Sequence, residues 1–120
     1  MKKRGFTLIE SLVVITMMMV VIAIASVNYS SASKKNRDNR RVADLERIRT
    51  ALELFRQEDL GGSYPASDGA LVTGGYIDAW PVGPKGVTDT YTYVRGGSNY
   101  TYLVTTTLET TGVGYSVANP

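Results

Sequence analysis

Glu10 is the residue of this chain whose type and position most clearly imply chemistry. From Phe6 to Val27 the sequence reads FTLIESLVVITMMMVVIAIASV, and Glu10 is the only charged residue in that stretch. An acid held at mid-membrane costs about 2.5 to 3.5 kcal/mol on insertion scales, so such residues are usually functional and paired. We therefore expect Glu10 to have a charged partner.

The other side chains form no recognisable catalytic or metal-binding set. The 120 residues include neither cysteine nor histidine, which excludes disulfides, thiolate metal sites and the usual general base. The glycines around Lys85 lack the spacing of a phosphate-binding loop. We expect a protein that is not an enzyme and that holds no cofactor and no metal.

The apolar stretch itself is long enough to cross a membrane. A helix over 6–27 would be about 33 Å long, against about 30 Å for the hydrocarbon core. Cations at positions 2–4 followed by apolar residues also begin a cleaved secretory signal. The run exceeds the length of about 7 to 15 residues of such a signal, and Ala23-Ile24-Ala25 only imitates a cleavage site. A specialised assembly helix is favoured over a signal peptide and over an ordinary membrane anchor.

The helix is predicted to continue into water, because no glycine or proline occurs from Asn28 to Asp59. Residues 28–60 form the amphipathic half of the same helix, and Gly61-Gly62 and Pro65 end it. Its apolar residues recur at spacings of three and four, as on one helical face. This stripe consists of Val42, Leu45, Ile48, Leu52 and Phe55.

The rest of the chain predicts a loop and a small sheet. Residues 61–90 are rich in glycine and proline, with one short helical turn at 70–72. Within 91–120, and beginning one residue before it, three runs rich in tyrosine, threonine and valine predict an antiparallel sheet, at 90–94, 100–106 and 113–117. A sheet this small needs a partner layer, and the helical stripe needs a cover. The sequence predicts an α+β fold with the sheet packed on the helix.

The order of the first residues resembles the start of type IV prepilins and type II secretion pseudopilins. The resemblance rests on the cations, Gly5, Phe6, Thr7-Leu8-Ile9, Glu10 and the apolar run that follows. It implies a type IV pilin-like fold and a basic leader, residues 1–5, which prepilin peptidase removes between Gly5 and Phe6 before it N-methylates Phe6. It also implies a single-pass protein of the bacterial cytoplasmic membrane, with a cytoplasmic leader and an external C-terminal domain, that later enters an envelope filament.

The resemblance also supplies partners for Glu10. In that family the glutamate of one subunit meets the α-amine of the methylated phenylalanine of a neighbour, here Phe6, as copies polymerise. Pairing relieves the cost of two desolvated charges, so it selects the alignment of the subunits more than it adds to the stability of the filament. The implied partners are further copies of the chain, prepilin peptidase, an inner-membrane assembly platform and membrane lipid. The alternative is that Glu10 only reaches the headgroups.

Motifs in the soluble part narrow the resemblance to major pseudopilins of type II secretion. They are Ala51-Leu52-Glu53-Leu54, Gly62-Ser63-Tyr64-Pro65, Gly75-Tyr76-Ile77 and Trp80-Pro81, in that order. The expected function is a structural subunit of a pseudopilus that supports protein secretion. The alternatives are a type IV pilus subunit for adhesion, motility or DNA uptake, and a membrane-anchored binding module that does not polymerise.

Calcium is not expected, although well-known major pseudopilins bind it in an acidic loop near the C-terminus. After Asn99 the only acid is Glu109, whereas calcium takes several oxygen ligands.

A run of cations follows the apolar stretch. Lys34, Lys35, Arg37, Arg40 and Arg41 surround a single acid, Asp38. By the positive-inside rule this run outweighs the leader cations and predicts the opposite orientation to the one the resemblance implies. We expect a solvated helix face that pairs with acids of neighbouring copies or with anionic headgroups. Contact with DNA is the less favoured alternative, and it would weaken steeply with salt.

Overall fold

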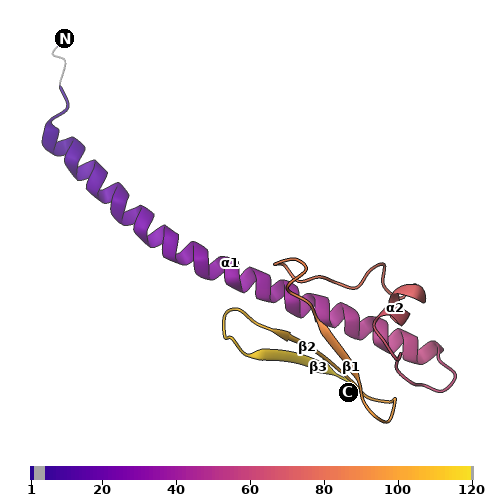
Figure 1. The fold of residues 1–120 in the computed structure, drawn as a ribbon. Helices are drawn as coiled ribbons and strands as arrows, with labels where there is room; N and C mark the ends of the chain where they lie inside the picture. The colour runs from indigo at the N-terminus through magenta and orange to yellow at the C-terminus, as the bar shows by residue number, and fades with distance from the viewer. Residues whose placement is uncertain (2–4, 120) are drawn as a thin grey trace. The chain divides into compact units, whose positions relative to one another are not determined.

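The computed structural model describes Met1 and residues 5–119 and confirms the predicted α+β class. A long helix, α1 (Leu8–Glu58), is followed by a short helix, α2 (Gly69–Thr73), and by three strands (Figure 1). The strands are β1 (Thr92–Arg95), β2 (Tyr102–Thr107) and β3 (Gly114–Ala118). One long N-terminal helix with a three-stranded antiparallel sheet is a type IV pilin-like layout.

α1 is uninterrupted because its sequence contains neither glycine nor proline. It begins two residues later and ends two residues earlier than the predicted span of 6–60. The turn that follows α1 contains Gly62 in the left-handed region, with φ of 63°, where glycine has no steric penalty. The Gly62 N–H donates to the Asp59 carbonyl at 2.9 Å, which closes this turn.

The three strands form an antiparallel sheet in the order β1-β2-β3. Val94 pairs with Leu103, and Leu103 pairs with Ala118. The β1–β2 turn is closed by a hydrogen bond from the Gly96 N–H to the Thr101 carbonyl at 2.8 Å. A Cβ on Gly96 would collide with the Thr101 side chain, so this turn requires glycine for space.

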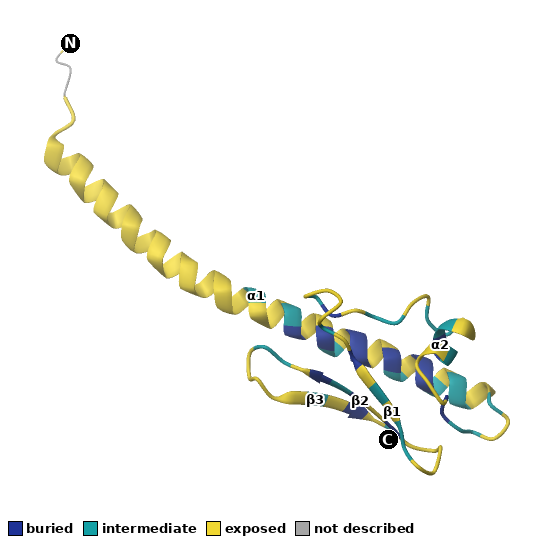
Figure 2. Ribbon diagram, in the orientation of Figure 1, coloured by how far each residue is buried: buried dark blue, intermediate teal, exposed yellow. Residues whose placement is uncertain are grey.

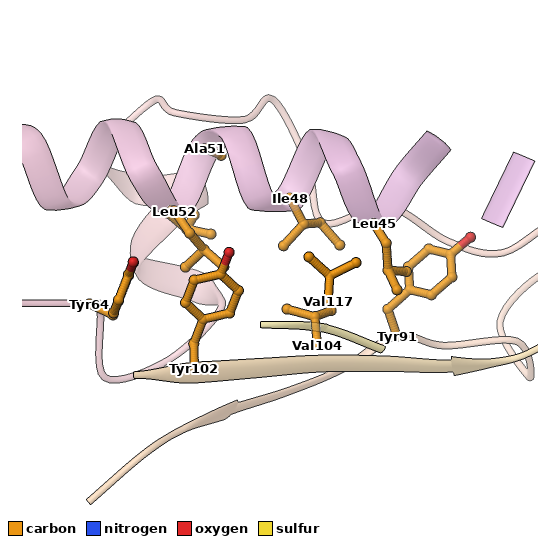
Figure 3. Close-up of a cluster of buried hydrophobic side chains, with 10 residues drawn as sticks. Leu45, Ile48, Ala51, Leu52, Tyr64, Tyr91, Tyr102, Val104 and Val117 are labelled. Atoms are coloured by element: carbon orange, nitrogen blue, oxygen red, sulfur yellow. The ribbon is translucent and has the colours of Figure 1, made fainter. Parts of the chain in front are cut away.

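The sheet covers the apolar stripe of α1, as predicted. Leu45, Ile48 and Leu52 are completely buried, and Val42 and Phe55, at the ends of the stripe, are half-buried. Figure 3 shows this face of α1 opposite side chains from β2 and β3 and from the segments that precede β1. The partners with the deepest burial are Tyr64, Leu71, Tyr91, Tyr102, Val104 and Val117.

The chain divides into two compact units, Met1–Lys34 and Lys35–Pro120, and the core just described belongs entirely to the second. In the first unit, every side chain from residue 5 to residue 32 is exposed (Figure 2). Among the described residues, α1 is the one helix long and apolar enough to cross a membrane. Its apolar N-terminal part therefore needs an external apolar environment, since the chain itself covers none of it.

Candidate functional site

The predicted cleavage site lies just before α1 and is accessible. Gly5 and Phe6 are both exposed, and 76% of the Phe6 surface is accessible. An added Cβ on Gly5 would meet no atom within 4 Å, and Gly5 has no positive φ. Nothing in the fold of the described chain therefore requires glycine at this position. Residues 2–4 of the predicted leader lie outside the described residues.

Glu10 and Thr7 close the start of α1 with a capping box. The Glu10 carboxylate Oε2 accepts hydrogen bonds from the Thr7 N–H at 3.4 Å and from the Thr7 Oγ1 at 3.3 Å. The Glu10 N–H in turn lies 3.3 Å from Thr7 Oγ1. This reciprocal arrangement satisfies amide groups that a helix N-terminus leaves open. This capping box was not predicted, although threonine followed three residues later by glutamate is its recognisable signal in the sequence.

Two uncharged polar side chains of the apolar stretch bond to the backbone of α1 itself. The Thr16 hydroxyl donates to the Val13 carbonyl and the Ser26 hydroxyl donates to the Ile22 carbonyl, both at 2.8 Å. These hydroxyls can enter hydrocarbon without a lost hydrogen bond. Glu10 therefore differs from them, because its charge still requires a counter-charge.

A second charged site lies around Arg41, whose side chain is only 2% exposed, in the second compact unit, Lys35–Pro120, which we call the soluble unit. Its guanidinium contacts three carboxylates from three different segments. The Nη1 lies 2.8 Å from Asp38 of α1, and the Nη2 lies 2.5 Å from Asp89, in the loop before β1, and 2.8 Å from Glu109, between β2 and β3. A planar guanidinium with five donors suits such multiple bonding.

Two further cations complete this group. Arg37 donates to both oxygens of Glu109, at 2.9 Å each, and the Lys85 ammonium lies 3.0 Å from Glu109. We call the six residues the Arg41 cluster: the cations Arg37, Arg41 and Lys85 and the acids Asp38, Asp89 and Glu109. Three positive charges meet three negative charges, so the desolvated charges compensate one another.

The β2–β3 loop also bonds to Asp38 through its backbone. The Glu109 and Thr110 N–H groups each donate to the Asp38 carboxylate at 2.8 Å, and the Thr110 hydroxyl donates to it as well. Burial raises the pKa of Asp38, but the hydrogen bonds from Thr110, the Glu109 N–H and Arg41 outweigh it and lower the pKa to about 2.

Cations act in the same direction on Glu109. The hydrogen bonds from Arg37, with those from Arg41 and Lys85, hold the pKa of Glu109 well below its ordinary value, against a smaller opposing effect of burial. Both carboxylates therefore stay ionised far into the acid range.

The Arg41 cluster corrects the prediction for the cation run. Arg41 is buried and Arg37 half-buried, and both pair with acids of their own chain. Only Lys34, Lys35 and Arg40 of the run are exposed, as predicted for a solvated face. The pairing of Arg41 with acids of its own chain was not predicted, because Asp89 and Glu109 lie 48 and 68 residues from Arg41. The local signal was Asp38, three residues before Arg41.

The residues around Glu109 do not fit a calcium site. Calcium takes six to eight oxygen ligands, whereas both oxygens of Glu109 contact guanidinium or ammonium groups. The neighbouring carboxylates of Asp38 and Asp89 are likewise bonded to Arg41. Among the described residues, no group of three or more acids or other ligands is arranged to hold a metal ion.

Comparison with known proteins places the N-terminus in a recognised class. Residues 1–26 match the family model of the prokaryotic N-terminal methylation motif. The match covers the predicted cleavage site, Glu10 and most of the apolar stretch, and it ends inside α1. No curated protein and no solved structure matches the chain. The comparisons thus support a type IV pilin-like, methylated N-terminus and do not distinguish a pseudopilin from a pilin.

Replacing Arg41 with methionine should strongly destabilise the soluble unit. The substitution leaves three carboxylates facing a buried position without their shared cation, and breaking a buried pair in this way costs about 3 to 5 kcal/mol. The measurement is urea unfolding of the full chain in detergent micelles. Arg49→Met is the matched control, since Arg49 is 39% exposed and lies 3.8 Å from Glu46, and it should cost less than about 1 kcal/mol. Equal effects of the two substitutions would contradict the role of the Arg41 cluster.

Stability should fall in acid because of Asp38 and Glu109. Their pKa values are lower in the folded state than the ordinary 3.8 and 4.5, so the unfolded chain takes up protons first. Their contribution is complete above about pH 4.5 and is lost as the pH falls toward about 2. The urea midpoint measured from pH 7 downward checks this. Asp38→Asn should flatten the acid limb, and an unchanged limb would contradict the assignment.

Proposed function

We propose that this chain is the precursor of a filament subunit, cut between Gly5 and Phe6 and polymerised through α1. The observation that carries the proposal is the match of residues 1–26 to the methylation motif, with the bond to be cut exposed ahead of α1. A peptidase needs an accessible peptide outside regular secondary structure, and Gly5 and Phe6, which are exposed and precede α1, supply one. The absence of any need for glycine within the fold supports recognition of Gly5 by another molecule.

The N-terminal part of α1 is the assembly element in this proposal. Its apolar side chains are exposed throughout, so lipid surrounds them before assembly and the α1 helices of other copies surround them afterwards. The leader faces the cytoplasm and the soluble unit lies outside the cytoplasmic membrane. Prepilin peptidase and an inner-membrane assembly platform are the partners that such a precursor requires.

Glu10 remains able to bind a neighbour while it caps its own helix. Both bonds from Thr7 end on Oε2, and no hydrogen bond within the described chain ends on Oε1. An ionised carboxylate accepts about four hydrogen bonds. Cleavage creates an α-amine on Phe6, and the amine of a neighbouring copy then supplies the counter-charge that Glu10 lacks in an apolar environment.

Within this class we propose the pseudopilus of a type II secretion system, in which the fibre supports protein export. The support is the resemblance of the soluble motifs to major pseudopilins. In the structure Tyr64 and Pro65 of these motifs are buried and Trp80 packs on Tyr93 with ring centroids 6.4 Å apart, so the motifs serve the fold around α1. The second candidate remains a surface type IV pilus, which shares the same N-terminus.

The mature N-terminus tests the proposal directly. Mass spectrometry of the protein from its native host should show a chain that begins at N-methylated Phe6. Gly5→Val should leave the precursor uncut, because a branched side chain replaces the residue that the peptidase reads. A wild-type protein that retains Met1 in peptidase-positive cells would refute processing.

The same cells separate the two kinds of fibre. Fibres that stay with the envelope fraction support the secretion pseudopilus, whereas fibres released by shearing favour the surface pilus. A processed protein that stays monomeric in both fractions would contradict polymerisation.

Loss of the Glu10 charge should abolish filaments without blocking processing. Glu10→Ala removes both the capping box and the charge. Glu10→Gln is the sharper variant, because glutamine can also close a capping box but cannot pair with an amine. Thr7→Val is the matched control, since it removes the cap and keeps the charge. Normal fibres from Glu10→Gln, counted by electron microscopy, would show that Glu10 acts only as a helix cap.

A further inference from the structure

Two arginines of α1 form no ion pair with an acid among the described residues. Most charged residues of the soluble part of α1 are paired: Glu46 lies 3.8 Å from Arg49 and Glu53 lies 3.9 Å from Arg56. The Arg41 cluster is balanced within itself. Arg40 and Arg47 are exposed, and within the described chain no ion pair joins either of them to an acid. Being seven residues apart, they lie on the same face of the helix.

These two arginines line a groove between α1 and the segment that leads to β1. Arg40, Asp44 and Arg47 form one wall, and residues 77–82, including Trp80, form the other. Asp44 is not available as a counter-ion at the surface, because it is buried and accepts a hydrogen bond from the Tyr91 hydroxyl at 2.8 Å. Asp78 in the far wall is exposed, so two exposed arginines face one exposed acid and the surface of the groove keeps an excess of one positive charge. Trp80 in the same wall is partly buried.

The dimensions of the groove favour protein side chains as its ligand. Its volume is about 180 Å³, whereas pockets for small molecules occupy about 300 to 1,000 Å³. Membrane headgroups are an unsuitable ligand, because Arg47 lies twenty residues after Val27, which is about 30 Å along the helix, and charges act over only about 8 to 10 Å in physiological salt. Exposed carboxylates of another protein surface match both the charge and the size.

Such carboxylates lie at the opposite end of the soluble unit, where α1 stops and α2 begins (Figure 1). Glu58 and Asp68 are exposed and Asp59 is half-buried. Glu58 Oε2 accepts a hydrogen bond from the Tyr76 hydroxyl at 2.6 Å and Asp59 Oδ2 accepts one from the Ser63 N–H at 2.9 Å. These bonds fix both side chains, and no hydrogen bond within the described chain ends on Glu58 Oε1, which is therefore open to a cation.

We propose that the groove at Arg40 and Arg47 binds the acidic end formed by Glu58, Asp59 and Asp68 of a second copy of the chain. The two surfaces are different and lie about 16 Å apart along α1, from Arg47 to Glu58. A contact between different surfaces of identical subunits is heterologous, and repetition of it with an axial displacement gives an open fibre instead of a closed dimer. This inference rests on the proposed polymerisation and names the contact between soluble units that sets the stagger.

Cysteine cross-linking of the full chain tests this contact, because the natural sequence has no cysteine. Cells express Arg47→Cys and Glu58→Cys chains together, and assembled fibres are oxidised. We expect a disulfide-linked dimer of one chain of each kind. The matched control pairs Arg49→Cys with Glu58→Cys, since Arg49 is on the same helix but outside the groove, and it should give no dimer. Fibres in which Arg47→Cys and Glu58→Cys do not cross-link, or in which the control links equally well, would overturn the proposal.

Charge reversal gives a second test that does not depend on the geometry of a disulfide. Arg47→Glu alone and Glu58→Arg alone should each reduce the fibre yield, and the double variant should restore it. A double variant as defective as either single one would overturn the pairing. Methylation of Phe6 and assembly of wild-type chains are measured in parallel, so that a failure of this contact is distinguished from a failure of polymerisation itself.

Discussion

The soluble unit depends on the buried Arg41 guanidinium, which joins segments that the apolar core does not hold by itself. The fully buried side chains of α1 lie between Leu45 and Leu52, whereas Asp89 and Glu109 reach α1 one turn earlier, at Arg41. The core therefore holds Tyr91, β2 and β3 on α1, and the Arg41 cluster adds the loop at Asp89 and the β2–β3 loop. A buried charge that loses its partner is costly, and a shifted sheet would leave the charges of the Arg41 cluster unpaired. The cluster therefore favours a single register of the sheet on α1.

α1 serves two environments with one continuous backbone. In the soluble unit its stripe is buried by the sheet and the intervening loop, so that unit supplies its own core. Over residues 8–27 the apolar side chains surround the helix on all sides and none is buried. A helix that is apolar all round is stable only inside lipid or among other helices. The division of α1 thus matches a chain that supplies its own core in one part and needs external apolar contacts in the other.

Charge pairing recurs along the chain as a means of setting positions. Surface ion pairs contribute little to stability, and buried pairs often cost as much as they return. Their value lies in the penalty for wrong arrangements. Arg41 among three carboxylates follows this logic in the structure, and the proposed contacts of Glu10 with a neighbouring amine and of the groove at Arg40 and Arg47 with a second copy would follow it at lower burial. Dispersion and apolar contact hold the layers together, while the charges select which alignment is allowed.

The helix, the strands and the N-terminal motif were readable from the sequence because each depends on neighbours within a few residues. The spacing of Leu45, Ile48 and Leu52 predicted the buried stripe, and glycine-rich turns predicted the strands to within about two residues. The capping box of Thr7 and Glu10 is equally local, although the prediction for Glu10 concerned only its charge. The partners of Arg41 could not be read in this way. Asp89 and Glu109 meet it only after the sheet has packed on α1, and no local pattern records which distant acid a cation will reach. Apolar periodicity thus determined the elements, and tertiary packing alone decided which charges are buried, paired or left exposed.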